Sequence, residues 1–283
     1  MTRVTTTLIS DLAFGEGPRW RDEGLYFSDI HADRVLLYRP NAGLEVVASF
    51  AGPVSGLGWL PDGRMLVVSM NDRRLLRREP DGAFLVHADL CQIATWHAND
   101  MVVAANGDAY VGNFGFSLEP PVEVKLANLA RVTAAGAVSV AARDLFFPNG
   151  SVITPDGRTL VIGESGARCL TAFDIDAEGA LSNRRIWADM PEGVTPDGIC
   201  LDAEGAIWVA SPKSREVLRI RQGGAVIERI ATEQQAIACM LGGGDRKTLF
   251  VCTAESTHPD LCRENHTARL LAIAVDVPGA GRP

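Results

Sequence analysis

The chain has 283 residues, of which 47% are hydrophobic and 22% charged, with 28 glycines and 15 prolines, which is an ordinary globular composition. No run of about 18 apolar residues occurs, and the polar start lacks the apolar core of a secretory signal, so we expect no membrane span. The net charge of −8, without a block rich in Lys or Arg, disfavours nucleic acid and leaves a small molecule as the expected partner.

One pattern recurs along the chain: a short apolar strand, a tight turn that ends in glycine, and a second apolar strand. Its copies cover residues 17–28, 57–69, 100–112, 150–163 and 198–210, with a degenerate sixth copy at 238–252. The turn glycines are residues 24, 63, 107, 157 and 205, which gives separations of 39, 44, 50 and 48 residues. Asp-Gly and Asn-Gly predict hairpin turns, because glycine readily adopts the positive φ that such turns need.

Two further strand-like runs follow each hairpin, for example 34–38 and 44–48, or 169–173 and 181–187. Four strands in about 40–50 residues are typical of a β-propeller blade. Six copies therefore predict an all-β fold, a six-bladed β-propeller with four-stranded blades, in which residues 1–283 form a single domain. The last blade lacks an outer strand, and the N-terminal run 2–9 is predicted to supply it and close the ring. A β-sandwich with coincidental Asp-Gly turns is the alternative.

Equivalent repeat positions in a propeller lie at equivalent places around the central axis. The position eight residues before each turn glycine, at the head of the innermost strand, is polar in five repeats: Glu16, Ser55, Asn99, Asn149 and Asp197. In the sixth repeat it falls near Cys239. A buried carboxylate is costly unless it is paired or bound to a metal, and no Lys or Arg occupies this ring.

These oxygen donors suit one divalent cation, with Ca²⁺ as the first expectation and Mg²⁺, Mn²⁺ or Zn²⁺ as alternatives. The competing interpretation is that the side chains cap strand ends and bond loop backbone. The second strands end at another polar rim, which is better placed to support the ring than to coordinate: Asp29, Ser69, Asn113, Glu164 and Ser211.

Three other segments stand out near this end of the predicted channel. His97 projects toward the mouth beside Trp96, and is a candidate for substrate contact or a structural histidine. Residues 114–125 interrupt the third blade and form either a lid or an inert surface loop. The polar stretch 252–269 indicates a loop.

The six cysteines form no C-x-x-C pair, and Cys200, Cys239 and Cys252 lie inside apolar runs. Without a signal peptide, this pattern predicts free buried thiols instead of a disulfide framework. We therefore expect a reducing, cytoplasmic location.

Four motifs carry a family resemblance. They are Phe-Gly-Glu-Gly-Pro-Arg-Trp at 14–20, Asn-Asp at 99–100, Phe-Pro-Asn-Gly at 147–150, and Pro-Asp-Gly-Ile at 196–199 followed by Asp-Ala-Glu-Gly at 202–205. In this order and spacing the chain resembles the senescence marker protein-30/gluconolactonase/luciferin-regenerating-enzyme (SMP-30) family. The resemblance implies a six-bladed propeller with one catalytic divalent metal held by Glu16, Asn149 and Asp197. It also implies that Asn99 contacts the substrate or a metal-bound water.

Two departures from the family pattern bear on the substrate. Sugar-lactonase members of the family carry a pattern like Arg-x-Asn-Asp at the third motif. This chain has His-Ala-Asn-Asp there, at 97–100. After the next strand, Gly-Asn-Phe-Gly-Phe at 112–116 replaces the usual Gly-Thr-Met and acidic residues. We therefore predict substrate contacts at His97, Asn99 and Asn113, with a substrate that is less polar than gluconolactone or differently shaped.

The sequence thus predicts an enzyme, a gluconolactonase-like, metal-dependent hydrolase of a lactone or related cyclic ester. In it, the metal and Asp197 activate water, with Asp197 as the catalytic residue. One alternative is other chemistry on the same metal site, such as phosphotriester hydrolysis or an isomerase or lyase step in a biosynthetic pathway. The other alternative is a calcium-binding propeller without catalytic activity.

Overall fold

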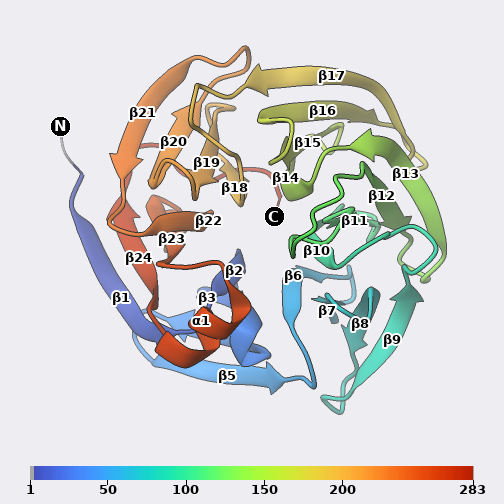
Figure 1. The fold of residues 1–283 in the computed structure, drawn as a ribbon, viewed down its shortest axis with the longest axis horizontal. Coiled ribbons are helices and arrows are strands. Elements are labelled where there is room, and N and C mark those ends of the chain that lie inside the picture. The colour runs from blue at the N-terminus through green and yellow to red at the C-terminus, as the bar shows by residue number, and fades with distance from the viewer. Residues whose placement is uncertain (1–2, 283) are drawn as a thin grey trace.

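Six four-stranded antiparallel sheets surround a central axis in the computed structural model, which describes residues 3–282 (Figure 1). Each sheet corresponds to one sequence repeat and is one blade. Five blades have their strands in chain order from the axis outward, and the sixth has the order β22-β23-β24-β1. The predicted all-β, six-bladed propeller is confirmed.

The strands of each blade are as follows. Blade 1 has β2 (Gly15–Arg21), β3 (Gly24–Asp29), β4 (Arg34–Arg39) and β5 (Gly43–Ser49), and blade 2 has β6 (Val54–Trp59), β7 (Met65–Ser69), β8 (Arg74–Arg78) and β9 (Phe84–Asp89). Blade 3 has β10 (Ala98–Val103), β11 (Ala109–Asn113), β12 (Ala127–Val132) and β13 (Val138–Leu145), and blade 4 has β14 (Pro148–Ile153), β15 (Thr159–Glu164), β16 (Cys169–Ile175) and β17 (Leu181–Asp189). Blade 5 has β18 (Ile199–Leu201), β19 (Ile207–Ser211), β20 (Glu216–Ile220) and β21 (Val226–Ala231), and blade 6 has β22 (Gln235–Gly242), β23 (Thr248–Ala254), β24 (Ala268–Ala274) and β1 (Thr5–Leu12).

Strand β1 closes the ring. It pairs antiparallel with β24, from Thr5 opposite Ile273 to Leu12 opposite Ala268, and so gives blade 6 its outermost strand. The predicted closing run began at Thr2, which lies outside the described residues, and the observed strand continues three residues beyond the predicted end at Ile9. Closure from the N-terminal side is confirmed.

The hairpin turns follow the prediction in four repeats and differ in the first. Glycines with positive φ occupy the turns of blades 2 to 5: Gly63, Gly107, Gly157 and Gly205. In blade 1 the positive φ values fall on Asp22 and Glu23, and Gly24 instead opens β3, where a Cβ would lie 2.5 Å from a methyl carbon of Leu37. The prediction that Gly24 is a turn glycine is therefore wrong, because Asp22 and Glu23 form this turn.

Burial decreases from the channel outward. Every residue of β10 and β14 is buried, whereas most of the outer strand β5 is exposed. The largest completely buried side chains include Trp208, Tyr110 and Phe27. Because the inner strands are buried on both faces, a polar residue on them can be tolerated only if it finds a partner or a ligand.

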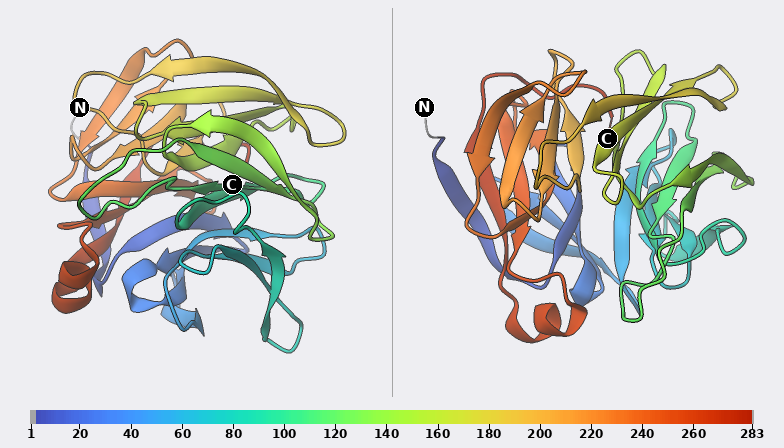
Figure 2. Two further views of the ribbon diagram at one scale, coloured as in Figure 1. Left: turned by 45° about the vertical axis from the view of Figure 1, so that its right-hand side comes forward. Right: turned by 45° about the horizontal axis from the view of Figure 1, so that its top comes forward.

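The two ends of the channel differ (Figure 2). At one end, the 3-10 helix η1 (Ile30–Ala32) packs near helix α1 (Pro259–Asn265). At the other end, the C-terminal segment crosses the blades, with Gly279 bridged to Asp202 and Arg282 to Ile153. The stretch 252–269 was predicted as a loop, and this is wrong for α1, which begins with Pro259 and ends at His266 in the left-handed conformation.

Two smaller expectations can be compared with the fold. All six cysteines are free thiols and five are buried, as predicted, with Cys91 partly exposed. Within residues 3–282, no helix has the length and apolar character needed to cross a membrane.

Candidate functional site

A β-bulge follows the predicted ring position in most inner strands. The register with the neighbouring strand shifts between Glu16 and Arg19, Val54 and Leu57, Ala98 and Met101, Pro148 and Ser151, and Ala236 and Ala238. A bulge bends the strand and redirects a side chain. In blade 6 the bulge lies between Ala236 and Ala238, directly before Cys239, so the residues at this level are apolar there.

Side chains from four blades meet at this level of the channel. The Asn99 amide donates to the Asn149 carbonyl oxygen at 3.1 Å, and the Ser55 hydroxyl donates to Asn99 at 3.5 Å. Asn149 in turn donates to Ser165 at 3.2 Å, and Ser165 donates to the backbone carbonyl of Pro196, the residue before Asp197, at 2.6 Å. Hydrogen bonds therefore link blades 2, 3, 4 and 5 around the predicted site.

Glu16 and Asp197 share one electrostatic environment. Glu16 is 4% exposed, and burial, followed by the charges of Asp197 and Asp100, raises its pKa well above the usual value. The Gly17 N–H, 2.9 Å from a Glu16 carboxylate oxygen, partly opposes this. Burial, followed by the charge of Asp100, raises the pKa of Asp197 to about 8, and the neighbouring Asn149 side chain lowers it. The three predicted ligands Glu16, Asn149 and Asp197 are thus close enough to influence one another.

The donor set fits a hard divalent cation. Neither Glu16, which is buried, nor Asp197, which is half-buried, forms an ion pair within the described part of the chain. Carboxylate and amide oxygens are the ligands that Ca²⁺ and Mg²⁺ prefer, and a cation would relieve the repulsion that raises both pKa values. No group of three or more His, Cys, Asp or Glu side chains in residues 3–282 forms a metal site, so the arrangement depends on the amides.

The second polar rim supports the loops that lead into the ring. Three backbone N–H groups donate to it: Phe14 to Asp29 at 2.7 Å, Phe146 to Glu164 at 2.7 Å, and Thr195 to Ser211 at 3.1 Å. These loop residues precede Glu16, Asn149 and Asp197 by two or three positions. The bonds agree with the predicted supporting role of the rim and show how the fold fixes each loop.

His97 lies in an aromatic cluster on blades 3 and 4. Its ring stacks on Trp96 with centroids 5.1 Å apart and lies 6.0 Å from Phe114, which stacks on Phe147 at 4.6 Å. Burial, followed by the charge of Arg73, lowers the pKa of His97, which favours a neutral imidazole. Contact of His97 with a substrate stays a prediction.

Asn113 is completely buried and bonds within its own blade. Its amide donates to the Asn128 carbonyl at 2.7 Å, and its carbonyl oxygen accepts from the Gly115 N–H at 3.0 Å. These bonds fix the start of the 114–126 connection between β11 and β12. Substrate contact by Asn113 therefore stays a prediction, and the geometry favours an indirect role through Phe114.

Two features escaped the sequence analysis. Ser165 bridges Asn149 to the loop of Asp197, and Arg19 pairs with Asp100 inside the channel at 2.6 Å. Arg19 lies three residues beyond Glu16 on the same strand, outside the ring positions that the repeat defines. The sequence signal that could have identified Arg19 was a charged residue inside an otherwise buried strand.

Fold and site together define a six-bladed propeller with an oxygen-lined centre in its channel. A family model described as the SMP-30/Gluconolactonase/LRE-like region matches residues 14–255. The chain therefore belongs to this family, as the motifs indicated.

Relatives cover nearly the whole chain. A 6-deoxy-6-sulfogluconolactonase of Pseudomonas putida is 24% identical over 95% of this chain and 94% of its own. Among solved structures, a luciferin-regenerating enzyme has a TM-score of 0.83 at 21% identity, covering 99% of this chain and 98% of its own. A regucalcin of Agrobacterium tumefaciens, described as a calcium-binding protein, has a TM-score of 0.83 at 22% identity, covering 100% of this chain and 97% of its own. At these identities the solved structures establish the fold alone.

Proposed function

We propose that this protein is a divalent-metal-dependent hydrolase of a lactone or related cyclic ester. The observation that most directly supports this proposal is that Glu16 and Asp197 share one site with Asn149 and lack an ion-pair partner within residues 3–282. Membership of the family supports the reaction class, as does the relative from Pseudomonas putida, whose name describes a lactonase.

Glu16, Asn149 and Asp197 would hold the cation, and the relative described as calcium-binding supports Ca²⁺ as the first choice. When bound, a divalent cation supplies Lewis-acid stabilisation for negative charge that develops on an ester carbonyl oxygen. Asp197 accepts the proton of the attacking water at its carboxylate. Asn99, held by Ser55 and Asn149, orients the substrate, and the neutral imidazole of His97 supplies a further hydrogen bond.

The aromatic cluster supports a substrate less polar than a sugar lactone. It contains Trp96, His97, Phe114, Phe116, Phe146 and Phe147. Such a surface binds apolar ring substituents and excludes water, whereas sugar hydroxyls need hydrogen-bonding partners. We therefore expect alkyl- or aryl-substituted lactones to be better substrates than gluconolactone.

The test is turnover of a substrate panel by protein that has been stripped of metal and reloaded with Ca²⁺. The panel contains gluconolactone, apolar lactones, linear esters and organophosphates. We expect lactone hydrolysis that chelation abolishes and that Asp197→Asn reduces about 100-fold or more. The matched control is Asp156→Asn, in the exposed turn of blade 4, which keeps full turnover. Unchanged turnover in Asp197→Asn or in chelated protein would contradict the proposal.

A calcium-binding protein without catalytic activity is the second candidate, because the similar regucalcin is described as a calcium-binding protein. The same experiment separates the two, since this candidate predicts Ca²⁺ binding with no turnover on any member of the panel. Turnover of organophosphates alone would assign the site to phosphotriester chemistry instead.

A further inference from the structure

The Arg19 side chain crosses the channel from blade 1 toward blades 2 and 3. Its Nη2 lies 2.6 Å from a carboxylate oxygen of Asp100 and 2.6 Å from the carbonyl oxygen of Met101, and its Nε lies 3.1 Å from the Leu57 carbonyl oxygen. Nη1 donates to the Pro18 carbonyl at 2.9 Å. Both charged partners are buried, with Arg19 5% and Asp100 3% exposed. Four hydrogen bonds thus hold the guanidinium in one orientation.

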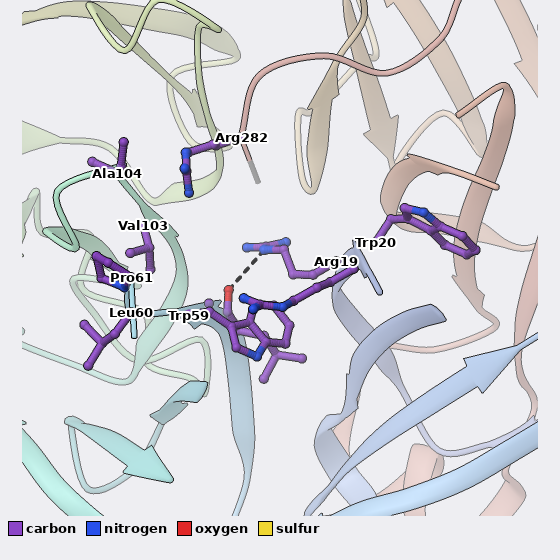
Figure 3. A pocket seen from close by; sticks show the side chains of 12 residues that line it. Arg19, Trp20, Trp59, Leu60, Pro61, Val103, Ala104 and Arg282 are labelled. Carbon is purple, nitrogen blue, oxygen red and sulfur yellow. Dashed lines mark hydrogen bonds between the residues drawn. The ribbon is translucent and has the colours of Figure 1, made fainter. Parts of the chain in front are cut away.

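Arg19 marks the boundary between the candidate metal centre and a cavity at the opposite end of the channel. This cavity of about 310 Å³ is lined by Arg19, Trp20, Trp59 and Arg282, among others, and by none of the four ring residues Glu16, Asn99, Asn149 and Asp197 (Figure 3). In Figure 3 a dashed line marks a hydrogen bond that Arg19 donates. Arg19 follows Glu16 by three residues along β2 and lies beyond the bulge that redirects the chain at Gly17.

The backbone around the pair is built for close approach. Gly56 of β6 faces Asp100 and Met101 of β10, and a Cβ at Gly56 would lie 2.6 Å from the Met101 nitrogen and 2.9 Å from the Asp100 carbonyl carbon. No side chain fits there without moving one strand. This contact brings β10 within reach of Arg19, so three blades define the position of the Asp100 carboxylate.

Asp100 acts on the proposed ligands. Its charge contributes to the raised pKa of both Glu16 and Asp197, whereas the charge of Arg19 lowers the pKa of Glu16. With Glu16, Asp197 and Asp100 all deprotonated, as binding of a cation requires, these three carboxylates and the Arg19 guanidinium sum to two negative charges around the candidate centre. One divalent cation neutralises these two negative charges. Without Arg19 there would be three negative charges.

We propose that Arg19 is a positioning residue of the metal centre, which holds Asp100 away from the cation and cancels its charge so that one divalent cation balances the site. The inference rests on the proposed metal centre of the preceding section. It assigns Asp100 to the support of the site and not to its ligand set, although Asp100 directly follows Asn99.

The experiment is a calorimetric titration of chelated protein with Ca²⁺ for the wild type, Arg19→Met, Asp100→Asn and the double variant. Arg19→Met raises the negative charge to three, so we expect Ca²⁺ affinity to increase about tenfold or a second Ca²⁺ to bind. Asp100→Asn lowers it to one, so we expect affinity to fall about tenfold. The double variant restores two charges, and its affinity returns to within about threefold of the wild type.

Arg19→Lys keeps the charge but cannot make all four hydrogen bonds of the guanidinium, so we expect nearly wild-type Ca²⁺ affinity and a lower thermal midpoint in chelator. This variant and the double variant keep the test decisive if Arg19→Met does not fold. Equal Ca²⁺ affinity in the wild type, Asp100→Asn and the double variant would overturn the role of Arg19 while leaving the proposed function intact. Absence of Ca²⁺, Mn²⁺ and Zn²⁺ binding to the wild type would instead overturn the metal centre itself.

Discussion

Buried carboxylates in this protein fall into two groups that differ in how their charge is balanced. Outside the candidate metal centre, each has an arginine partner: Asp29 with Arg34 at 2.8 Å, Asp108 with Arg131 at 2.6 Å, Glu164 with Arg184 at 3.1 Å, and Asp202 with Arg219 at 2.6 Å. At the centre, the buried Glu16 and the half-buried Asp197 have no ion pair among residues 3–282. Asp100, paired with Arg19 but acting on both ligands, lies between the groups.

The difference separates carboxylates that stabilise the fold from those that serve a ligand. Burying a carboxylate requires compensation in both groups, and an arginine supplies it permanently in the first. The second group leaves the compensation to a cation from solution, so the folded chain keeps like charges close together at some cost in stability. Substitutions in the first group should therefore lower the free energy of unfolding and leave activity unchanged. Substitutions in the second group should lower activity without a loss of stability in chelator.

The largest effect is expected when a carboxylate of the metal centre is neutralised. Glu16→Gln removes a ligand charge, so we expect kcat/KM for the best lactone to fall about 100-fold or more. In chelator, the free energy of unfolding should stay unchanged or increase, because a buried charge without an ion pair has been removed. Steady-state kinetics at saturating Ca²⁺ and urea denaturation measure the two quantities. A clear loss of stability in chelator would place Glu16 in the first group.

Breaking an arginine–carboxylate pair of the first group should lower stability and leave activity unchanged. Arg219→Leu leaves Asp202, which is 1% exposed, without its partner, and we expect the free energy of unfolding to fall by about 3 kcal/mol. Ca²⁺ affinity and kcat/KM per folded molecule should not change. The matched control is Arg229→Leu, which breaks the more exposed pair with Glu216 and should cost less than about 1 kcal/mol. Equal costs for the two variants, or a loss of Ca²⁺ affinity in Arg219→Leu, would remove the distinction.

The sequence predicted the members of the candidate metal centre because the repeat makes equivalent positions comparable. A fixed offset of eight residues identified Asn99, Asn149 and Asp197 from turn glycines, and Glu16 from Gly24, which opens β3. The same rule gave no definite position in blade 6, where Arg246 takes the place of the turn glycine and the bulge lies between Ala236 and Ala238. Local regularity was therefore sufficient where the repeat is intact.

Partnership between blades could not be predicted in this way. Arg19 and Asp100 are 81 residues apart, and their contact depends on the close approach of β6 and β10 at Gly56. Asn113 presented the opposite difficulty, because an amide suits a substrate contact and a backbone bond equally well in the sequence. Only the positions of Asn128 and Gly115 reveal that its donors and acceptor are engaged.

His31 extends the comparison with a third solution to burial, which is the loss of a proton, and its effect is the smallest that we expect. Burial, followed by the charge of Arg263, lowers the pKa of His31 to about 4; His258 also lowers it, whereas Asp29 and Asp260 act in the opposite direction. Its Nδ1 is buried without a hydrogen-bond partner in the described residues, and the ring packs 5.4 Å from Phe14. The folded protein therefore favours the neutral imidazole.

This preference fixes the sign of a pH effect on stability. The unfolded chain protonates His31 near its ordinary pKa of 6.5, whereas the folded chain keeps it neutral down to about pH 4. The unfolded state thus binds an extra proton between these values, so the contribution of His31 to stability is complete above about pH 6.5 and declines as the pH falls toward 4. In chelator, we expect the Tm of the wild type to fall by a few degrees more than that of His31→Asn between about pH 7 and pH 4.5. The carboxylates titrate in both proteins, so the difference isolates His31, and parallel Tm profiles would show that the imidazole is protonated in the folded state.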